Sequence, residues 1–99
     1  MKQKGIPQAL RREAAAARKQ AAAARVRAAT VREVASARND AAAADPQRAP
    51  LLHREAELGG REANLYEKSA KVYEGEALRA EAQAGAEEAI RKRKSSKAK

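Results

Sequence analysis

Alanine limits what this chain can fold into more than any other feature, because it supplies 28 of the 99 residues. Only 15 larger apolar residues remain, and neither Phe nor Trp occurs. A chain of this size with so few large side chains cannot build a conventional layered core. Its apolar residues are instead suited to narrow contacts between closely spaced backbones.

The distribution of prolines and helix-forming residues predicts two long helices. Pro46 and Pro50 stand in the one strong turn signal of the interior, residues 45–50. The segments on either side are rich in Ala, Arg, Glu, Gln and Lys, which favour helices, and poor in the β-branched residues that favour strands. We therefore expect an all-α protein with helices at 10–44 and 51–90.

Basic residues dominate both ends of the chain, and we expect flexible tails at 1–9 and 91–99. Gly59 and Gly60 count against an unbroken second helix, because each glycine costs about 1 kcal/mol in a helix interior. The pattern of apolar residues nevertheless continues across them without a change of phase.

Apolar positions recur in both helices at alternating steps of four and three residues, the seven-residue repeat of left-handed coiled coils. If the chain folds back at the turn, these positions meet in pairs whose residue numbers add up to 94. A large residue then faces a small one at nearly every layer, which fills a narrow contact well. We call this predicted contact the seam, and its informative members are Leu10, Ala21, Ala28, Val31, Leu52, Tyr66 and Tyr73.

Charged residues beside the seam test the same register independently. One flank carries Arg11, Arg18, Arg25 and Arg32 in the first helix and Glu67, Glu74, Glu81 and Glu88 in the second. In an antiparallel pair these two stripes face each other. Each exposed ion pair contributes only about 0.2–1 kcal/mol, but the agreement of register favours an antiparallel helical hairpin over separate extended helices.

A second apolar row of the second helix lies outside the seam. It consists of Leu51, Leu58, Leu65 and Val72, and we call it the partner ridge. Four large apolar residues in a row are unusual on a solvent-exposed face. We expect a protein partner to cover them, with a homodimeric four-helix bundle or a broad apolar face closing over the hairpin edge as alternatives.

Ten basic residues would gather at one end of such a hairpin, because the turn lies at the other. They are Lys2, Lys4, Arg11, Arg12, Arg91, Lys92, Arg93, Lys94, Lys97 and Lys99. A cluster of this kind attracts polyanions. The run 91–94 also resembles a short nuclear-import signal or a nucleic-acid-binding tail, and phosphorylation of Ser95 and Ser96 would reduce its charge.

The sequence offers no pattern that indicates catalysis or a cofactor. There is no Cys, and His53 with Glu57 one turn away falls short of the three protein ligands of a catalytic zinc site. The glycines do not match phosphate-binding loops. Tyr66 and Tyr73 are expected inside the seam, so that base stacking is not indicated.

Targeting and membrane signals are weak. The longest apolar runs are four alanines, far short of the roughly 20 residues of a membrane span, and no apolar core of a secretory signal occurs. The basic bias of residues 1–32 resembles a transit peptide, but a basic helix of the mature protein is the favoured interpretation. A basic amphipathic helix on a membrane surface lacks the usual Trp or Phe.

These observations predict a non-enzymatic structural subunit of a large assembly, inside the cell and without a cofactor. Its hairpin would dock other protein subunits by the partner ridge, and its basic tails would contact a polyanion, with ribosomal RNA as the first candidate. The alternative is a coiled-coil protein associated with filaments such as microtubules, in which the helices run extended along the lattice.

Overall fold

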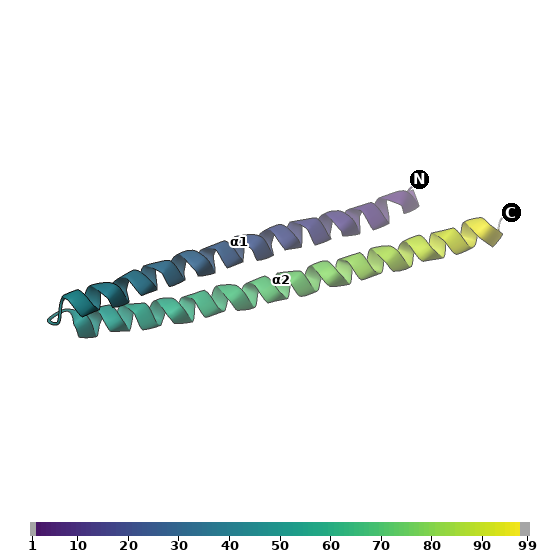
Figure 1. Ribbon diagram of the computed structural model, residues 1–99. Coiled ribbons are helices and arrows are strands. Elements are labelled where there is room, and N and C mark those ends of the chain that lie inside the picture. The colour runs from purple at the N-terminus through teal and green to yellow at the C-terminus, as the bar shows by residue number, and fades with distance from the viewer. Residues whose placement is uncertain (1, 98–99) are drawn as a thin grey trace. The chain divides into compact units, whose positions relative to one another are not determined.

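The computed structural model describes residues 2–97 of the chain, and the side chains of residues 5–95. It consists of two α-helices, α1 (Lys2–Ala44) and α2 (Ala49–Lys97), with no strand in the described part. The two helices form an antiparallel hairpin (Figure 1). The predicted all-α hairpin is therefore confirmed.

The turn between the helices comprises residues 45–48. The Asp45 N–H still donates to the Ala41 carbonyl at 3.0 Å, and the Arg48 N–H donates to the Asp45 carbonyl at 3.2 Å. Pro46 fixes its own backbone angle in this turn. Pro50 is the second residue of α2, where a missing N–H costs nothing because helix-initial amides have no helical partner.

Both helices are longer than the sequence predicted. α1 begins at Lys2 rather than at residue 10, and α2 ends at Lys97 rather than at residue 90. Pro7 lies inside α1, where it removes one helical hydrogen bond close to the helix start. Basic residues in the last turns of α2 interact favourably with the helix dipole. Residues assigned to tails thus continue the helices.

The molecule divides into two compact units, each made of one part of α1 and one part of α2. Unit 1 comprises Met1–Gln20 and Val72–Lys99, and unit 2 comprises Ala21–Lys71. Within each unit the two helix segments lie side by side. The core of unit 1 contains a cluster of Ala14, Ala17, Ala77 and Ala80.

Unit 2 is also held together mainly by alanines. Its buried apolar residues are Ala21, Ala24, Ala28, Ala35, Ala42, Leu52, Ala56, Ala63 and Ala70. Leu52, 7% exposed, is the one large apolar side chain buried in the described part of the chain. α2 passes through Gly59 and Gly60 without a break, as the phase of the apolar pattern favours.

Gly59 explains how the backbones approach so closely in unit 2. A methyl carbon placed on Gly59 would lie 3.3 Å from Cβ of Ala35 and 3.6 Å from Cγ1 of Val31. The distance to Ala35 is shorter than the roughly 3.5–4.0 Å of comfortable carbon–carbon packing. Gly59 and Ala35 are one of the pairs whose numbers add up to 94, so that this layer of the seam has the predicted register.

Candidate interaction surfaces

The remaining predicted seam residues are shielded from solvent to different degrees. Ala21 is 2% exposed and Ala28 is fully buried. The larger members are half-buried, namely Leu10, Val31, Tyr66 and Tyr73. Large side chains at these layers reach the edge of a contact that is filled mainly by methyl groups, and part of each remains in water.

Ion pairs join the two helices along the flank where Arg and Glu stripes were predicted. In unit 1, Arg11 pairs with Glu88 at 2.9 Å, and Arg18 pairs with Glu81. In unit 2, Arg32 pairs with Glu67 at 3.1 Å. The three pairs follow one register, which specifies the alignment of the helices more than it stabilises them, because all six side chains are at least one-third exposed.

The opposite flank of unit 2 holds an ion pair that the sequence reasoning missed. Arg38 forms an ion pair with Glu55 across the helices, with Nε and Oε2 3.0 Å apart. Arg38 lies three residues beyond Ala35 in the seam pattern, opposite the start of α2. His53 and Asn39 lie on the flank of the Arg and Glu stripes instead, seven-residue steps away from Glu67 and Arg32, and contact each other with Nδ1 and Oδ1 3.0 Å apart.

Charge is unequally divided between the two units. Unit 1 contains 13 basic and 6 acidic residues, whereas unit 2 contains 9 basic and 7 acidic residues. Within unit 1, residues 1–12 and 89–99 contain ten basic residues and no acidic residue. We call these two segments the basic end, and both belong to the same compact unit.

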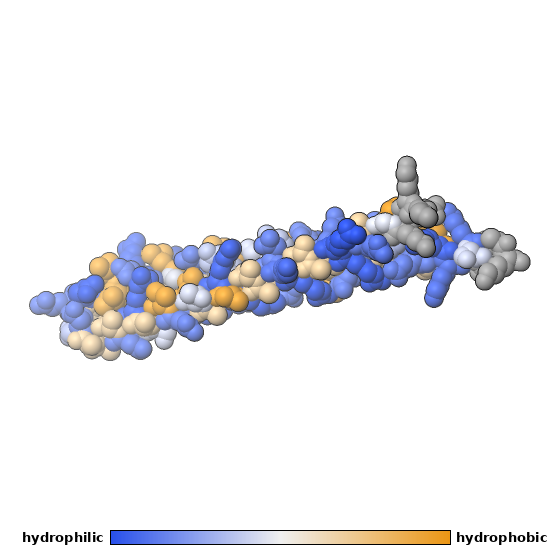
Figure 2. Space-filling view, turned by 90° about the horizontal axis from the view of Figure 1, so that it is seen from above, coloured by the Kyte–Doolittle hydropathy of each residue, from blue (hydrophilic) through white to orange (hydrophobic). Residues whose placement is uncertain are grey.

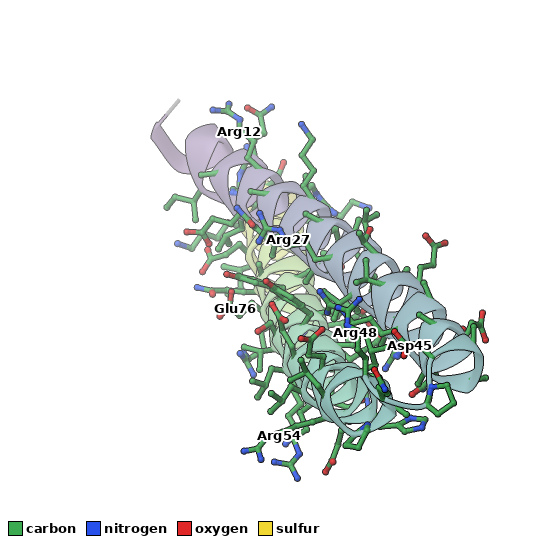
Figure 3. All side chains as sticks on the ribbon, turned by 90° about the vertical axis from the view of Figure 1, so that its left-hand side faces the viewer. Arg12, Arg27, Asp45, Arg48, Arg54 and Glu76 are labelled. Carbon is green, nitrogen blue, oxygen red and sulfur yellow. The ribbon has the colours of Figure 1, made fainter. Side chains whose placement is uncertain are left out.

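The described side chains of the basic end differ in their ion pairing and in their exposure to solvent. Arg11 makes a bidentate contact with Glu88, with nitrogen–oxygen distances of 2.9–3.1 Å, so that its charge is already partly balanced. Arg12, labelled in Figure 3, and Lys92, Arg93 and Lys94 are exposed, whereas Arg91 is half-buried. The side chains of Lys2, Lys4 and Lys97, and all of Lys99, lie outside the described residues.

The partner ridge is exposed in both units. Leu51, Leu58 and Leu65 in unit 2 are 55%, 52% and 63% exposed, and Val72 in unit 1 is 59% exposed. In the space-filling view, apolar side chains gather over the part of the molecule near the turn (Figure 2). The broad apolar face considered as an alternative therefore does not cover the three leucines within unit 2.

A shallow groove of about 300 Å³ runs beside Leu58 in unit 2. Its apolar lining comes from both helices and includes Val31 and Val34 of α1. Leu58 and Gly59 line the groove from α2. It adds an apolar hollow to the leucine row, and sequence reasoning did not identify it.

Residues considered for metal binding and membrane insertion are arranged as follows. Within residues 2–97 no three His, Asp or Glu side chains are grouped closely enough to hold a metal ion. No helical stretch in the same residues is both long and apolar enough to cross a bilayer. His53 is exposed and contacts Asn39 rather than Glu57, which accepts a hydrogen bond from Arg61 at 2.8 Å.

Comparison of the chain with protein-family models, with curated proteins and with solved structures finds no match.

Proposed function

We propose that this chain is a non-enzymatic structural subunit of a large macromolecular assembly, docking other protein subunits by its partner ridge and contacting a polyanion by its basic end. RNA, and ribosomal RNA first, is the polyanion we favour. The observation that carries the proposal is the basic end itself, with ten basic residues and no acidic residue. Such a cluster gains free energy by releasing condensed counterions from phosphates.

The geometry of the basic end favours phosphates over bases. Lys92, Arg93 and Lys94 are consecutive residues of α2, so that they point around the helix at intervals of about 100°. No single face is shaped to read base edges. The only two aromatic residues, Tyr66 and Tyr73, are half-buried in the seam, which leaves little surface for base stacking. Binding should therefore depend strongly on salt and weakly on sequence.

An RNA-binding titration over a series of salt concentrations tests the polyanion contact. We expect the wild-type chain to bind unrelated RNAs with similar affinity, and Lys92→Gln/Arg93→Gln/Lys94→Gln to weaken binding and flatten its salt dependence. The matched control is Arg27→Gln/Arg48→Gln/Lys71→Gln, which removes three exposed cations from unit 2. Equal losses in both variants would show that net charge, rather than the basic end, drives binding.

Docking by the ridge is tested separately, by pull-down of the tagged chain from its native source with and without nuclease. Leu58→Glu/Leu65→Glu should abolish incorporation and leave RNA affinity nearly unchanged. Val26→Glu/Leu78→Glu is the control, because these residues are 65% and 60% exposed but stand off the ridge. Recovery of a filament protein that is unaffected by nuclease would favour the filament-associated alternative instead.

A further inference from the structure

Two rows of opposite charge border the three leucines of unit 2. The row four residues after each of the first two leucines is acidic, and consists of Glu55 and Glu62. The row three residues after each leucine is basic, and consists of Arg54, Arg61 and Lys68. Residues three and four apart are neighbours on a helix surface. The leucines therefore form an apolar line with the acidic row on one side and the basic row on the other.

The acidic row lies on the side of the leucines that borders α1. Glu55 pairs with Arg38 of α1 at 3.0 Å, and Glu62 lines the groove that Val34 of α1 also lines. The basic row lies on the side away from α1. Arg54 points away from α1 in Figure 3, and Arg61 reaches only Glu57 of its own helix, at 2.8 Å.

This arrangement complements itself when two copies are related by a two-fold axis parallel to α2. The rotation brings the acidic row of each copy against the basic row of the other, on both sides of a central line of leucines. Glu55 then meets Arg54 of the second copy, and Glu62 meets its Arg61, at nearly equal heights. An antiparallel pair would instead place acid opposite acid and base opposite base. Charges beside an apolar line set helix orientation in coiled coils in this way.

We propose that the leucines of unit 2 are covered by a second copy of this chain, with the two α2 helices parallel and in register at Leu51, Leu58 and Leu65. The side chains are 52–63% exposed in one copy, and stacking them on their equivalents removes this apolar surface from water. The contact would add large apolar side chains to the buried core of unit 2, in which Leu52 is the only large buried side chain among the described residues.

The inference deepens the docking half of the proposed function and rests on it, because it names the first protein that the ridge docks. It is independent of the polyanion contact. Self-association is therefore measured by sedimentation equilibrium without nucleic acid, and RNA affinity is measured separately on the same variants. Wild-type chain that stays monomeric at all concentrations would overturn the inference, while ridge-dependent incorporation in the pull-down would still support docking to a different protein.

A charge exchange between the rows tests the surface and its pairing. Glu55→Lys/Glu62→Lys puts base on both sides of the leucines, and Arg54→Glu/Arg61→Glu puts acid on both sides. We expect each variant alone to self-associate at least about tenfold more weakly than wild type, and an equimolar mixture to form a heterodimer. Glu62→Lys alone keeps the Arg38–Glu55 pair and should weaken association in the same direction. Unchanged association of all three variants would overturn the proposal.

Cysteine cross-linking tests the orientation, because the chain has no Cys of its own. In the parallel pair, Leu51→Cys should oxidise to a disulfide-linked homodimer, and so should Leu65→Cys. An antiparallel pair centred on Leu58 would place residue 51 opposite residue 65. Efficient cross-linking only in a mixture of Leu51→Cys and Leu65→Cys would therefore overturn the parallel arrangement.

Discussion

Gly59 and Gly60 are adjacent in α2, yet we expect a methyl group added to each to have different effects on stability. Each substitution by alanine gains helix propensity, worth about 0.5–1 kcal/mol. Apart from its chain neighbours and the nearby backbone of its own helix, a methyl group on Gly60 meets no atom within 4 Å among the described residues. Gly60→Ala should therefore stabilise the protein by about this amount.

A methyl group on Gly59 meets a different environment. It would lie 3.3 Å from Cβ of Ala35, and because alanine has no rotamer to change, only a shift of the helix backbones relieves the contact. Overpacking of this kind costs about 1–3 kcal/mol. Set against the gain in propensity, Gly59→Ala should be neutral or destabilising by up to about 2 kcal/mol.

Thermal unfolding followed by far-UV circular dichroism, at one protein concentration for all samples, measures the difference. The two variants should differ by about 1–3 kcal/mol, and a domain of this size shifts by about 4–8 °C per kcal/mol. Gly60→Ala is thus the matched control for Gly59→Ala. Equal stabilisation by both substitutions would mean that α1 and α2 do not approach each other at Ala35, which would refute the seam in unit 2.

The ion pairs and the core of unit 2 give three further predictions, each checked by the same unfolding assay. Glu67→Arg should destabilise the protein by about 0.5–1 kcal/mol by placing two cations together, and adding Arg32→Glu should restore most of the loss; no restoration would refute the pairing. Leu52→Ala should cost about 2–4 kcal/mol, whereas Leu51→Ala should cost less than about 0.5 kcal/mol in dilute protein, and equal costs would contradict their burial. Tyr66→Phe should change stability by less than about 0.5 kcal/mol, because its hydroxyl reaches Glu62 only at 3.5 Å, and a large loss would point to a stronger contact.

The hairpin and its alignment were predictable because two kinds of residue report the same register. The spacing of apolar positions pairs residue 35 with residue 59, and the structure places Ala35 against Gly59. The charged stripes independently pair residue 32 with residue 67, and Arg32 donates to Glu67. Agreement between packing and charge along one helix pair left little freedom for another antiparallel alignment.

Helix ends and local polar contacts were less predictable, because they depend on small free energies. Whether α1 starts at residue 2 or 10 depends on the cost of Pro7 against the propensity of the residues before it. Arg38 pairs with Glu55, but the sequence position of Arg38 also allows it to pair with residues one helical turn away from Glu55. The groove beside Leu58 is lined by side chains of both helices, and a repeat of apolar positions within each helix does not specify such a hollow.

The helical form of residues 91–97 changes what the basic end can do. In an extended tail, consecutive cations reach successive phosphates of one strand, so that Lys92, Arg93 and Lys94 together would contribute a salt slope of about 2.1 on single-stranded RNA. On a helix they point about 100° apart, and one strand contacts at most two of them. Because α2 continues to Lys97, replacing all three by glutamine should lower the slope by only about 1.4. A decrease of the slope by about 2.1, the value for all three contacts, would mean that this segment leaves its helical form when it binds RNA.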